Sequence, residues 1–356
     1  TMDSIFRRKY FIVKKENFAD KNNIEDSGRM DKQNRLVILL VLIITAIVFS
    51  GSLKLGWTNW DDNLYIYENP NVREATLAKI FLPPANPAEN NTYNPLVISS
   101  FALEWKLVHD RPFLYHLNNV LLHLCCTALV WLFFRGMGLS VWWSSFAALL
   151  FGIHPMRVES VAWITERKDL LSALFYLAAL LFYLRYIASG KNKQLFLTFI
   201  FFTLSLFSKI QAVTFPFALV LLDWYFQRKI NKKVILEKAA FFAGSLVFGL
   251  LVGITFLFKK AEVITWSKIL SFVEQIALSG YAYVVYILKA GVPWVTSALY
   301  PAPARLQPEH WIGVALAIVI VAGAVAVYRK YRFITFGILF FTFNVLFLPM
   351  AAAVGD

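Results

Sequence analysis

The stretch that decides the fold is LVILLVLIITAIVFSGSL, residues 36–53, which contains no charged side chain. An uninterrupted apolar run of this length is sufficient for one helix to cross the hydrocarbon core of a bilayer. Comparable runs recur through the 356 residues, of which 58% are hydrophobic, 17% aromatic and 16% charged. Because no soluble core needs so much apolar surface, the sequence predicts an all-α, polytopic transmembrane helical bundle of about nine or ten spans.

Charged residues on either side of this first run orient the chain. Basic residues precede it, so we expect residues 1–35 to form a cytoplasmic tail and residues 36–356 to form one membrane domain. Residues 54–115, with five Lys/Arg and seven Asp/Glu, and residues 259–310 are then predicted to be outer loops. In the first of these loops we expect a Pro-rich turn at Pro83–Pro87 and an amphipathic helix over Leu96–Val108 that lies in the membrane interface. The segment Gln227–Lys238 carries five Lys/Arg and one Glu, and it is predicted to be an inner loop.

The net charge of +13 follows the same distribution, because basic residues gather in the short segments between apolar runs. This placement indicates membrane lipids as partners and argues against nucleic acid. The basic segment Tyr328–Arg332 is expected inside, and counting the spans that precede it then predicts that Phe272–Ala290 is interfacial or re-entrant. The alternative is that Phe272–Ala290 spans the membrane and the charge rule fails at the end of the chain. Cys125 and Cys126 are adjacent within an apolar run, which favours packing over a disulfide framework.

The segment Trp57-Thr58-Asn59-Trp60-Asp61-Asp62-Asn63 follows the first run and places two carboxylates on the outer side of the membrane. Arg167, Lys168 and Lys209 fall on the same side, against the usual bias of positive charge toward the cytoplasm. A carboxylate can remove a proton from an acceptor hydroxyl, and fixed cations can stabilise a departing phosphate. The combination predicts group transfer from a lipid phosphate.

Several of these residues have structural alternatives. Lys209 can snorkel from a tight hairpin, Arg167, Lys168 and Asp169 can form a local salt bridge at a helix start, and Pro155 after His154 can stop a helix. His116, Asn119 and His123 share one helical face, which favours a hydrogen-bonded polar stripe over haem ligation. A divalent metal at Asp61 and Asp62 is not favoured, because consecutive side chains diverge and no third carboxylate is nearby in sequence.

Several short motifs lie between about residue 55 and the end of the chain. They are Trp60-Asp61-Asp62-Asn63 with Glu68-Asn69-Pro70, Tyr93-Asn94-Pro95-Leu96, Tyr115-His116-Leu117-Asn118-Asn119 with Leu122-His123, His154-Pro155, Glu159 to Trp163, Glu166-Arg167-Lys168-Asp169, Ser208-Lys209 with Val213-Thr214 and Pro216, Leu222-Asp223, and Tyr300-Pro301. In these motifs the chain resembles GT-C membrane glycosyltransferases. It is most similar to bacterial relatives of the transmembrane, tetratricopeptide-repeat-containing protein O-mannosyltransferases.

The resemblance implies an enzyme that transfers a sugar, mannose or another hexose, from a polyprenyl- or dolichyl-phosphate. The acceptor is a hydroxyl, of protein Ser/Thr or of a glycan, and the implied mechanism is inverting single displacement without a cofactor. Asp61 is implied as the base, with Asp62 supporting it or orienting the acceptor. Arg167, Lys168 and Lys209 are the candidates for the donor phosphate, and the candidates for lining the site are His154, Glu159, Asp169, Tyr93, His116, His123 and Tyr300. The active face is implied to be extracytoplasmic.

Two departures from the family pattern leave a second reading open. Relatives often continue into further spans and helical repeats, whereas this chain ends at Asp356, so a truncated or inactive portion is one expectation. Ile210-Gln211 stands where relatives commonly have a proline. The alternative to an enzyme is a non-catalytic GT-C-like scaffold subunit of a larger membrane assembly. A flippase is less favoured, because polar residues crowd one face instead of lining the membrane depth.

Overall fold

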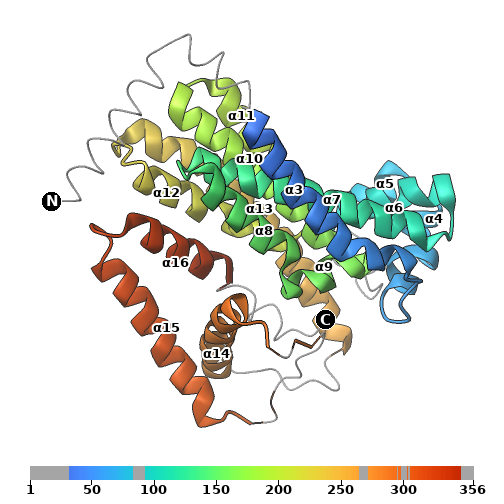
Figure 1. Ribbon diagram of the computed structural model, residues 1–356. Coiled ribbons are helices and arrows are strands. Elements are labelled where there is room, and N and C mark those ends of the chain that lie inside the picture. The colour runs from blue at the N-terminus through green and yellow to red at the C-terminus, as the bar shows by residue number, and fades with distance from the viewer. Residues whose placement is uncertain are drawn as a thin grey trace.

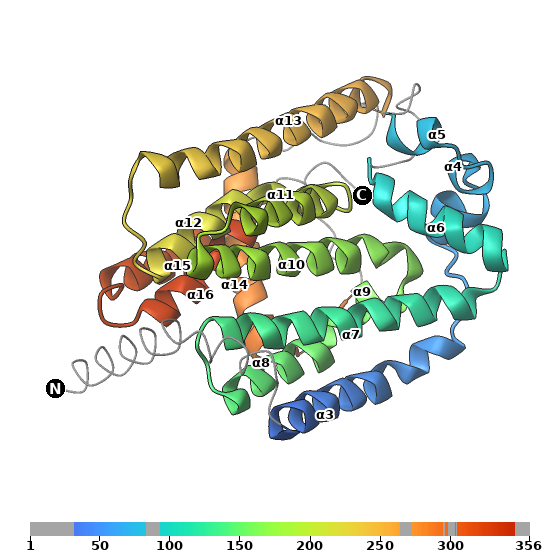
Figure 2. The same cartoon turned by 90° about the horizontal axis from the view of Figure 1, so that it is seen from above.

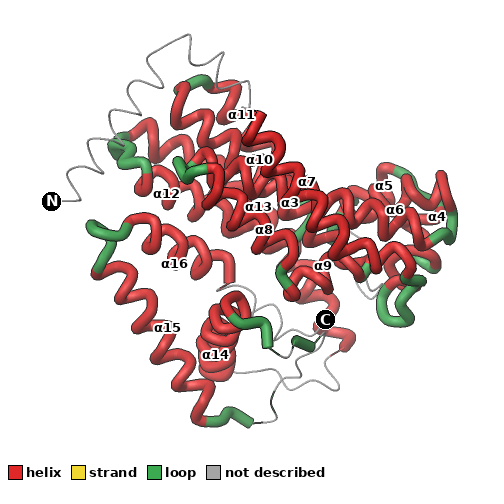
Figure 3. Tube along the Cα trace, in the orientation of Figure 1, coloured by secondary structure: helices red, strands yellow, loops and turns green. Residues whose placement is uncertain are grey.

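The computed structural model describes residues 32–82, 93–263, 272–294, 296–297, 303 and 305–345. Within these ranges the chain forms helices joined by turns, with no strand (Figure 3). This confirms the expected all-α bundle. The expected Pro-rich turn at Pro83–Pro87 lies outside the described residues, as does Tyr300.

Five of the described helices are long and apolar enough to cross a membrane. They are α3 (Lys32–Phe49), α7 (Pro112–Gly136), α10 (Arg167–Ser189), α13 (Lys232–Val263) and α15 (Pro308–Ala326). Other helices accompany them, namely α8 (Val141–Ile153), α11 (Asn192–Leu206), α12 (Phe215–Tyr225), α14 (Phe272–Gly291) and α16 (Arg332–Val345). The chain is therefore a multi-pass membrane protein, while the number of nine or ten spans stays a prediction.

The segment between α3 and α7 folds over one end of the bundle, where α4, α5 and α6 lie together (Figure 2). We call residues 50–82 and 93–111 the cap. It contains η1 (Ser50–Lys54), the π-helix η2 (Asn63–Tyr67), α4 (Pro70–Arg73), α5 (Leu77–Phe81) and α6 (Pro95–Val108). The helix expected over Leu96–Val108 is confirmed, and it begins at Pro95 because proline at the first position gives up only an N–H that has no partner in the helix.

A small apolar core joins the cap to the bundle. Ile66, Val72 and Phe101 from the cap are fully buried against Tyr115 of α7 and Ile164 beside α10. Trp57 adds an edge-on contact, with its ring centroid 4.9 Å from that of Tyr115. The side chains that follow η1 are thus held against the ends of α7 and α10 by burial of aromatic and aliphatic surface.

The larger core lies among α10, α11, α12 and α13, where Phe202, Phe215 and Phe241 pack together. At the end of these helices away from the cap, Asp223 of the Leu222-Asp223 motif accepts a hydrogen bond from the Tyr183 hydroxyl at 2.8 Å and pairs with Lys238. Glu237 and the partly exposed Arg228 complete this set of two acids and two bases. Paired in this way, the charges join α10, α12 and α13 without an uncompensated ion.

Helices α14 and α15 lie beside the main bundle (Figure 1), whereas α16 packs against α12 and contributes Phe336 to the larger core. α14 and α15 meet backbone to backbone: a Cβ placed on Gly313 would lie 2.5 Å from the Tyr281 Cα, and one on Gly280 would lie 2.6 Å from the Val314 Cα. Small residues at such a crossing let helices approach closely in a membrane. Phe272–Ala290 lies within α14 and is helical. Its interfacial or re-entrant placement stays a prediction.

This crossing predicts opposite effects for one substitution at two glycines of α15. We expect Gly313→Ala to lower the thermal unfolding temperature, because the added methyl overlaps the backbone of Tyr281 and overpacking costs about 1–3 kcal/mol. Gly323→Ala is the control, since no atom lies within 4 Å of its Cβ position and alanine favours helix by about 0.5–1 kcal/mol. Equal melting temperatures of the two purified variants would contradict the close crossing.

Candidate active site

The two consecutive carboxylates have different surroundings. Asp62 is fully buried, and its Oδ2 accepts hydrogen bonds from the backbone N–H of Thr58 at 2.7 Å and from the Thr58 hydroxyl at 2.9 Å. Asp61 is only partly buried, and its carbonyl accepts the N–H of Tyr65 as η2 begins. Short π-helical segments are rare and occur often at functional sites. Asp62 therefore closes the turn from Thr58, while Asp61 keeps contact with solvent.

A tryptophan pair connects this turn to the motif at residues 154–169. The rings of Trp60 and Trp163 stack with centroids 5.6 Å apart and planes inclined by 22°. Trp60 remains 54% exposed, so one side of the pair is open. Asp61 follows Trp60 directly, and the stack therefore brings it beside the segment that leads into α10.

Two lysines and two carboxylates form a cluster at the start of α10. The Lys168 Nζ lies 3.0 Å from Glu166, and the Lys209 Nζ lies 3.8 Å from the other oxygen of Glu166 and pairs directly with Asp169. Ser160 donates to Asp169 at 3.0 Å. Burial lowers the pKa of Lys209, but Asp169 and Glu166 outweigh this and raise it overall, so the lysine is charged. The side chains of Lys168 and Lys209 are 14% and 21% exposed.

The cap reaches the same cluster from the side of α6. The N–H of Leu96, at the start of α6, donates to the carbonyl of Phe207 at 3.2 Å, two residues before Lys209. The Lys168 Nζ lies 5.9 Å from the centroid of the Tyr65 ring in η2. Asp61, Lys168, Lys209 and Asp169, predicted from motifs far apart in sequence, thus lie at one end of the bundle. A partly exposed acid at the same end of the bundle as partly exposed cations is an arrangement suited to proton removal and to binding an anion.

Glu159 belongs to the edge of this cluster. Desolvation, and then the negative charges of Glu166 and Asp169, raise the pKa of Glu159 above its ordinary 4.5. The folded protein therefore binds this proton more tightly than the unfolded chain does, and the associated stability is lost as pH rises through the raised pKa.

A pH series of melting temperatures tests this assignment. We expect Glu159→Gln to melt above wild type near neutral pH and to match it below about pH 4.5, with a difference under about 1 kcal/mol because the site is partly solvated. Glu74→Gln is the control of opposite sign, since its hydrogen bond with Lys79 lowers the pKa of Glu74 and its stability contribution is lost as pH falls. Parallel pH profiles for the two variants would contradict the placement of Glu159.

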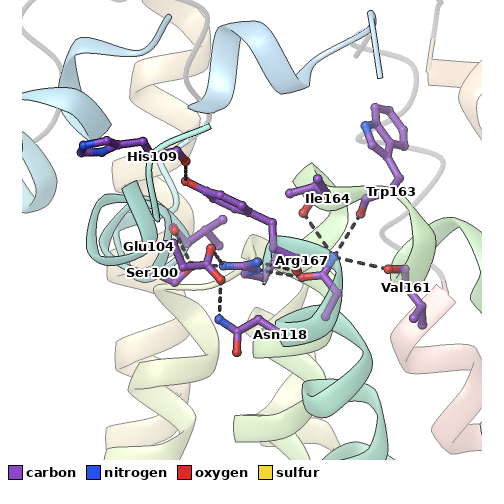
Figure 4. A network of polar contacts seen from close by, with 11 residues as sticks. Ser100, Glu104, His109, Asn118, Val161, Trp163, Ile164 and Arg167 are labelled. Atoms are coloured by element: carbon purple, nitrogen blue, oxygen red, sulfur yellow. Dashed lines mark hydrogen bonds and ion pairs between the residues drawn. The ribbon is translucent and has the colours of Figure 1, made fainter. Parts of the chain in front are cut away.

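The expectation that Arg167 binds a donor phosphate is corrected by its surroundings. Arg167 is 1% exposed, and Figure 4 shows it inside a polar network that includes Glu104 and Ser100. Its Nε donates to the Asn119 Oδ1 at 2.8 Å, one terminal nitrogen donates to the Tyr115 carbonyl at 3.0 Å, and the other donates to Glu104 and to Ser100. With each nitrogen engaged inside the protein, Arg167 has a structural role.

The histidines divide in the same way. His116 is buried, and its Nε2 lies 3.3 Å from the carbonyl of Gly56. Because Gly56 directly precedes the Trp57–Asp62 turn, His116 supports the start of that turn. His123 does not line the site: it is fully buried between Phe49 and Phe151, with Nε2 2.8 Å from the carbonyl of Gly152.

His154 and Tyr93 make connecting contacts. The His154 Nδ1 accepts the N–H of Met156 at 3.3 Å, and its Nε2 lies 3.2 Å from the Ala290 carbonyl, which ties α14 to the cap end of α8. The Tyr93 hydroxyl donates to the Phe81 carbonyl at 2.8 Å, and its ring packs near Phe248. These contacts hold elements together, and a direct part in the site stays a prediction for both residues.

The sequence analysis did not single out Glu104, although a signal was present. Val97, Phe101, Glu104 and Val108 recur at helical spacing, so the acid falls on the face of α6 that turns to the core. A buried acid on such a face requires a cationic partner, and Arg167 supplies it. Among the described residues, no group of three or more His, Cys, Asp or Glu side chains could hold a metal ion.

Known proteins provide an independent comparison. The chain is similar to protein O-mannosyl-transferase TMTC3 of Mus musculus, with 30% identity over 163 residues, and to protein O-mannosyl-transferase TMTC1 of the same species, with 36% over 152 residues. The matches cover 44% and 39% of this chain, but only 18% and 16% of those proteins. Protein O-mannosyl-transferase TMTC2 of Homo sapiens is 37% identical over 97 residues, 27% of this chain and 12% of that protein.

No family model matches the chain, and no solved structure matches it significantly. The chain spans less than a fifth of the length of the two mouse relatives. The resemblance that the motifs predict is nevertheless confirmed: over part of its length, this chain is a homologue of proteins named as protein O-mannosyl-transferases.

Proposed function

We propose that the chain carries the membrane-embedded catalytic site of a protein glycosyltransferase that uses a hexose linked to a polyprenyl phosphate. The observation that supports this most is the Trp60–Trp163 stack, because it brings the turn that carries Asp61 against the segment that leads to Lys168. The similarity to named O-mannosyl-transferases supports the same reaction class. Mannose is the sugar that those names favour.

In the proposed reaction Asp61 accepts the proton of an acceptor hydroxyl while the oxygen of that hydroxyl attacks the anomeric carbon of the donor sugar. The bond between that carbon and the phosphate oxygen breaks, and the departing polyprenyl phosphate takes its electron pair. Lys168 and Lys209 stabilise this charge, and they do so by exchanging part of their contact with Glu166 for contact with the phosphate. Attack opposite the leaving group inverts the configuration of the sugar.

The proposed orientation puts the cap and the candidate active site on the extracytoplasmic side and residues 1–35 in the cytoplasm. The basic segment Gln227–Lys238, which follows α12 and includes the first turns of α13, supports this because it lies at the end of the bundle away from the cap. The acceptor then approaches from outside, and the polyprenyl chain remains in the bilayer.

The test is transfer from radiolabelled polyprenyl-phosphate-mannose by the purified chain in lipid nanodiscs, with separate Ser/Thr-containing peptide and glycan acceptors. Label in the peptide supports the proposal, and label in the glycan alone replaces the protein acceptor with a carbohydrate one. Failure to bind or turn over the donor would favour the scaffold reading.

Lys209→Gln should raise the donor KM, whereas an unchanged KM would remove Lys209 from the phosphate site.

A further inference from the structure

One amide side chain contacts three carbonyl groups of the segment that carries Trp163. α9 (Val158–Ala162) ends there, an extended residue follows, and a short 3-10 turn (Ile164–Glu166) leads into α10. Helix ends and such turns leave some carbonyl groups without backbone partners, although the Ile164 carbonyl also accepts the N–H of Arg167. The carbonyls of Val161, Trp163 and Ile164 converge on one point (Figure 4), and the Nδ2 of Asn119 lies 3.3 to 3.4 Å from all three.

Asn119 is itself fixed by Arg167. The Asn119 side chain is fully buried, and its Oδ1 accepts the Nε–H of Arg167 at 2.8 Å. This bond determines which amide atom points toward the three carbonyls, since only the NH2 group can donate to them. Arg167 is held in turn by the carboxylate of Glu104 from the cap. Its orientation therefore depends on α6 as well as on α10.

We propose that Asn119 and Arg167 are positioning residues for the candidate active site. They fix the Trp163 segment against α7, Trp163 then sets the position of Trp60 through the ring stack, and Trp60 sets that of Asp61. The catalytic part of this inference rests on the proposed function, whereas the geometric part does not. Arg167 acts through Asn119, without contacting donor or acceptor.

The geometric part is tested by cross-linking. Cysteines replace Trp60 and Trp163 in a chain with Cys125→Ala and Cys126→Ala, and a short bifunctional thiol reagent is applied to protein in nanodiscs. We expect rapid cross-linking, a severalfold slower reaction with Asn119→Ala, and little change with Asn118→Ala. Asn118 is a matched control, because it is the preceding residue on α7 and donates to Glu104 without contacting the Trp163 segment in Figure 4.

The catalytic part is tested by kinetics in chains with both tryptophans present. Asn119→Ala should lower kcat on the order of a hundredfold, as displacement of a reacting group by about 1 Å does, and should leave the donor KM nearly unchanged. Asn118→Ala should retain most of the activity. Asn119→Asp keeps an oxygen that accepts from Arg167 but places its second oxygen against the carbonyls, so its kcat should fall as in Asn119→Ala. It is the variant to measure if Asn119→Ala does not fold.

Three outcomes separate the claims. If either Asn119 variant cross-links at the rate of Asn118→Ala, the positioning role is overturned whether or not the chain is an enzyme. If cross-linking falls but a raised donor KM explains the whole loss of activity, Asn119 belongs to donor binding and the inference is also overturned. If the chain with cysteines at positions 60 and 163 cross-links as expected but the chain with both tryptophans transfers no sugar, the proposed function fails while the positioning of the Trp163 segment by Asn119 stands.

Discussion

Replacement of Asp61 by asparagine is expected to lower kcat for sugar transfer by about 10²- to 10⁴-fold, the usual contribution of a general base. Asparagine has nearly the same shape but cannot accept the hydroxyl proton, so the donor KM should change little. The measurement is steady-state transfer from polyprenyl-phosphate-mannose to peptide, with donor binding followed separately. A variant with wild-type turnover would show that Asp61 is not the base.

Asp62→Asn is the matched control, because it replaces a carboxylate by an amide in the same way at the next residue. The Asp62 Oδ2 accepts two hydrogen bonds from Thr58, and the asparagine carbonyl oxygen can accept both. We therefore expect a smaller loss of kcat, through loosening of the turn. If Asp62→Asn lost as much kcat as Asp61→Asn at equal melting temperature, the two carboxylates would have to act as a unit.

The sequence predicted that the polar motifs share one face of the membrane, and the structure brings several of them to one end of the bundle, while the side of the membrane stays a prediction. Hydropathy predicted the helices that carry them. The helix expected at Leu96–Val108 was found at Pro95–Val108, and α10 begins at the predicted Arg167-Lys168-Asp169 motif. Both results follow from local signals, namely an apolar run and the residues that begin or end a helix. Helical periodicity and the distribution of basic residues along the chain can both be read without knowing which helices pack together.

The sequence could not predict the depth of each charged side chain. Consecutive residues of a helix point about 100° apart, so Lys168 can face the Glu166 cluster while Arg167 points into the protein. The partners of Arg167 are 63 and 48 residues away, at Glu104 and Asn119, and they meet it only when α6 and α7 pack on α10. A cation that binds phosphate and one that pairs with a buried acid look alike until that packing is known.

Replacement of Glu104 by leucine is expected to lower the free energy of unfolding by about 3–5 kcal/mol, because it leaves the charge of Arg167 buried without a partner. Adding Arg167→Met should restore most of this stability, since well-packed apolar residues often replace a buried ion pair without loss. Glu74→Leu is the comparison at an exposed pair, where little change is expected. A double variant no more stable than Glu104→Leu alone would show that the ion pair is not what stabilises this contact.

The same double variant separates stability from positioning. Methionine at position 167 fills the space of arginine but cannot donate to Asn119, so the amide that meets the carbonyls of the Trp163 segment loses its fixed orientation. We therefore expect the double variant to melt near wild type yet to keep a low kcat and slow cross-linking between positions 60 and 163. Recovery of all three together would mean that Arg167 contributes only to folding, and that Asp61 is positioned by the cap alone.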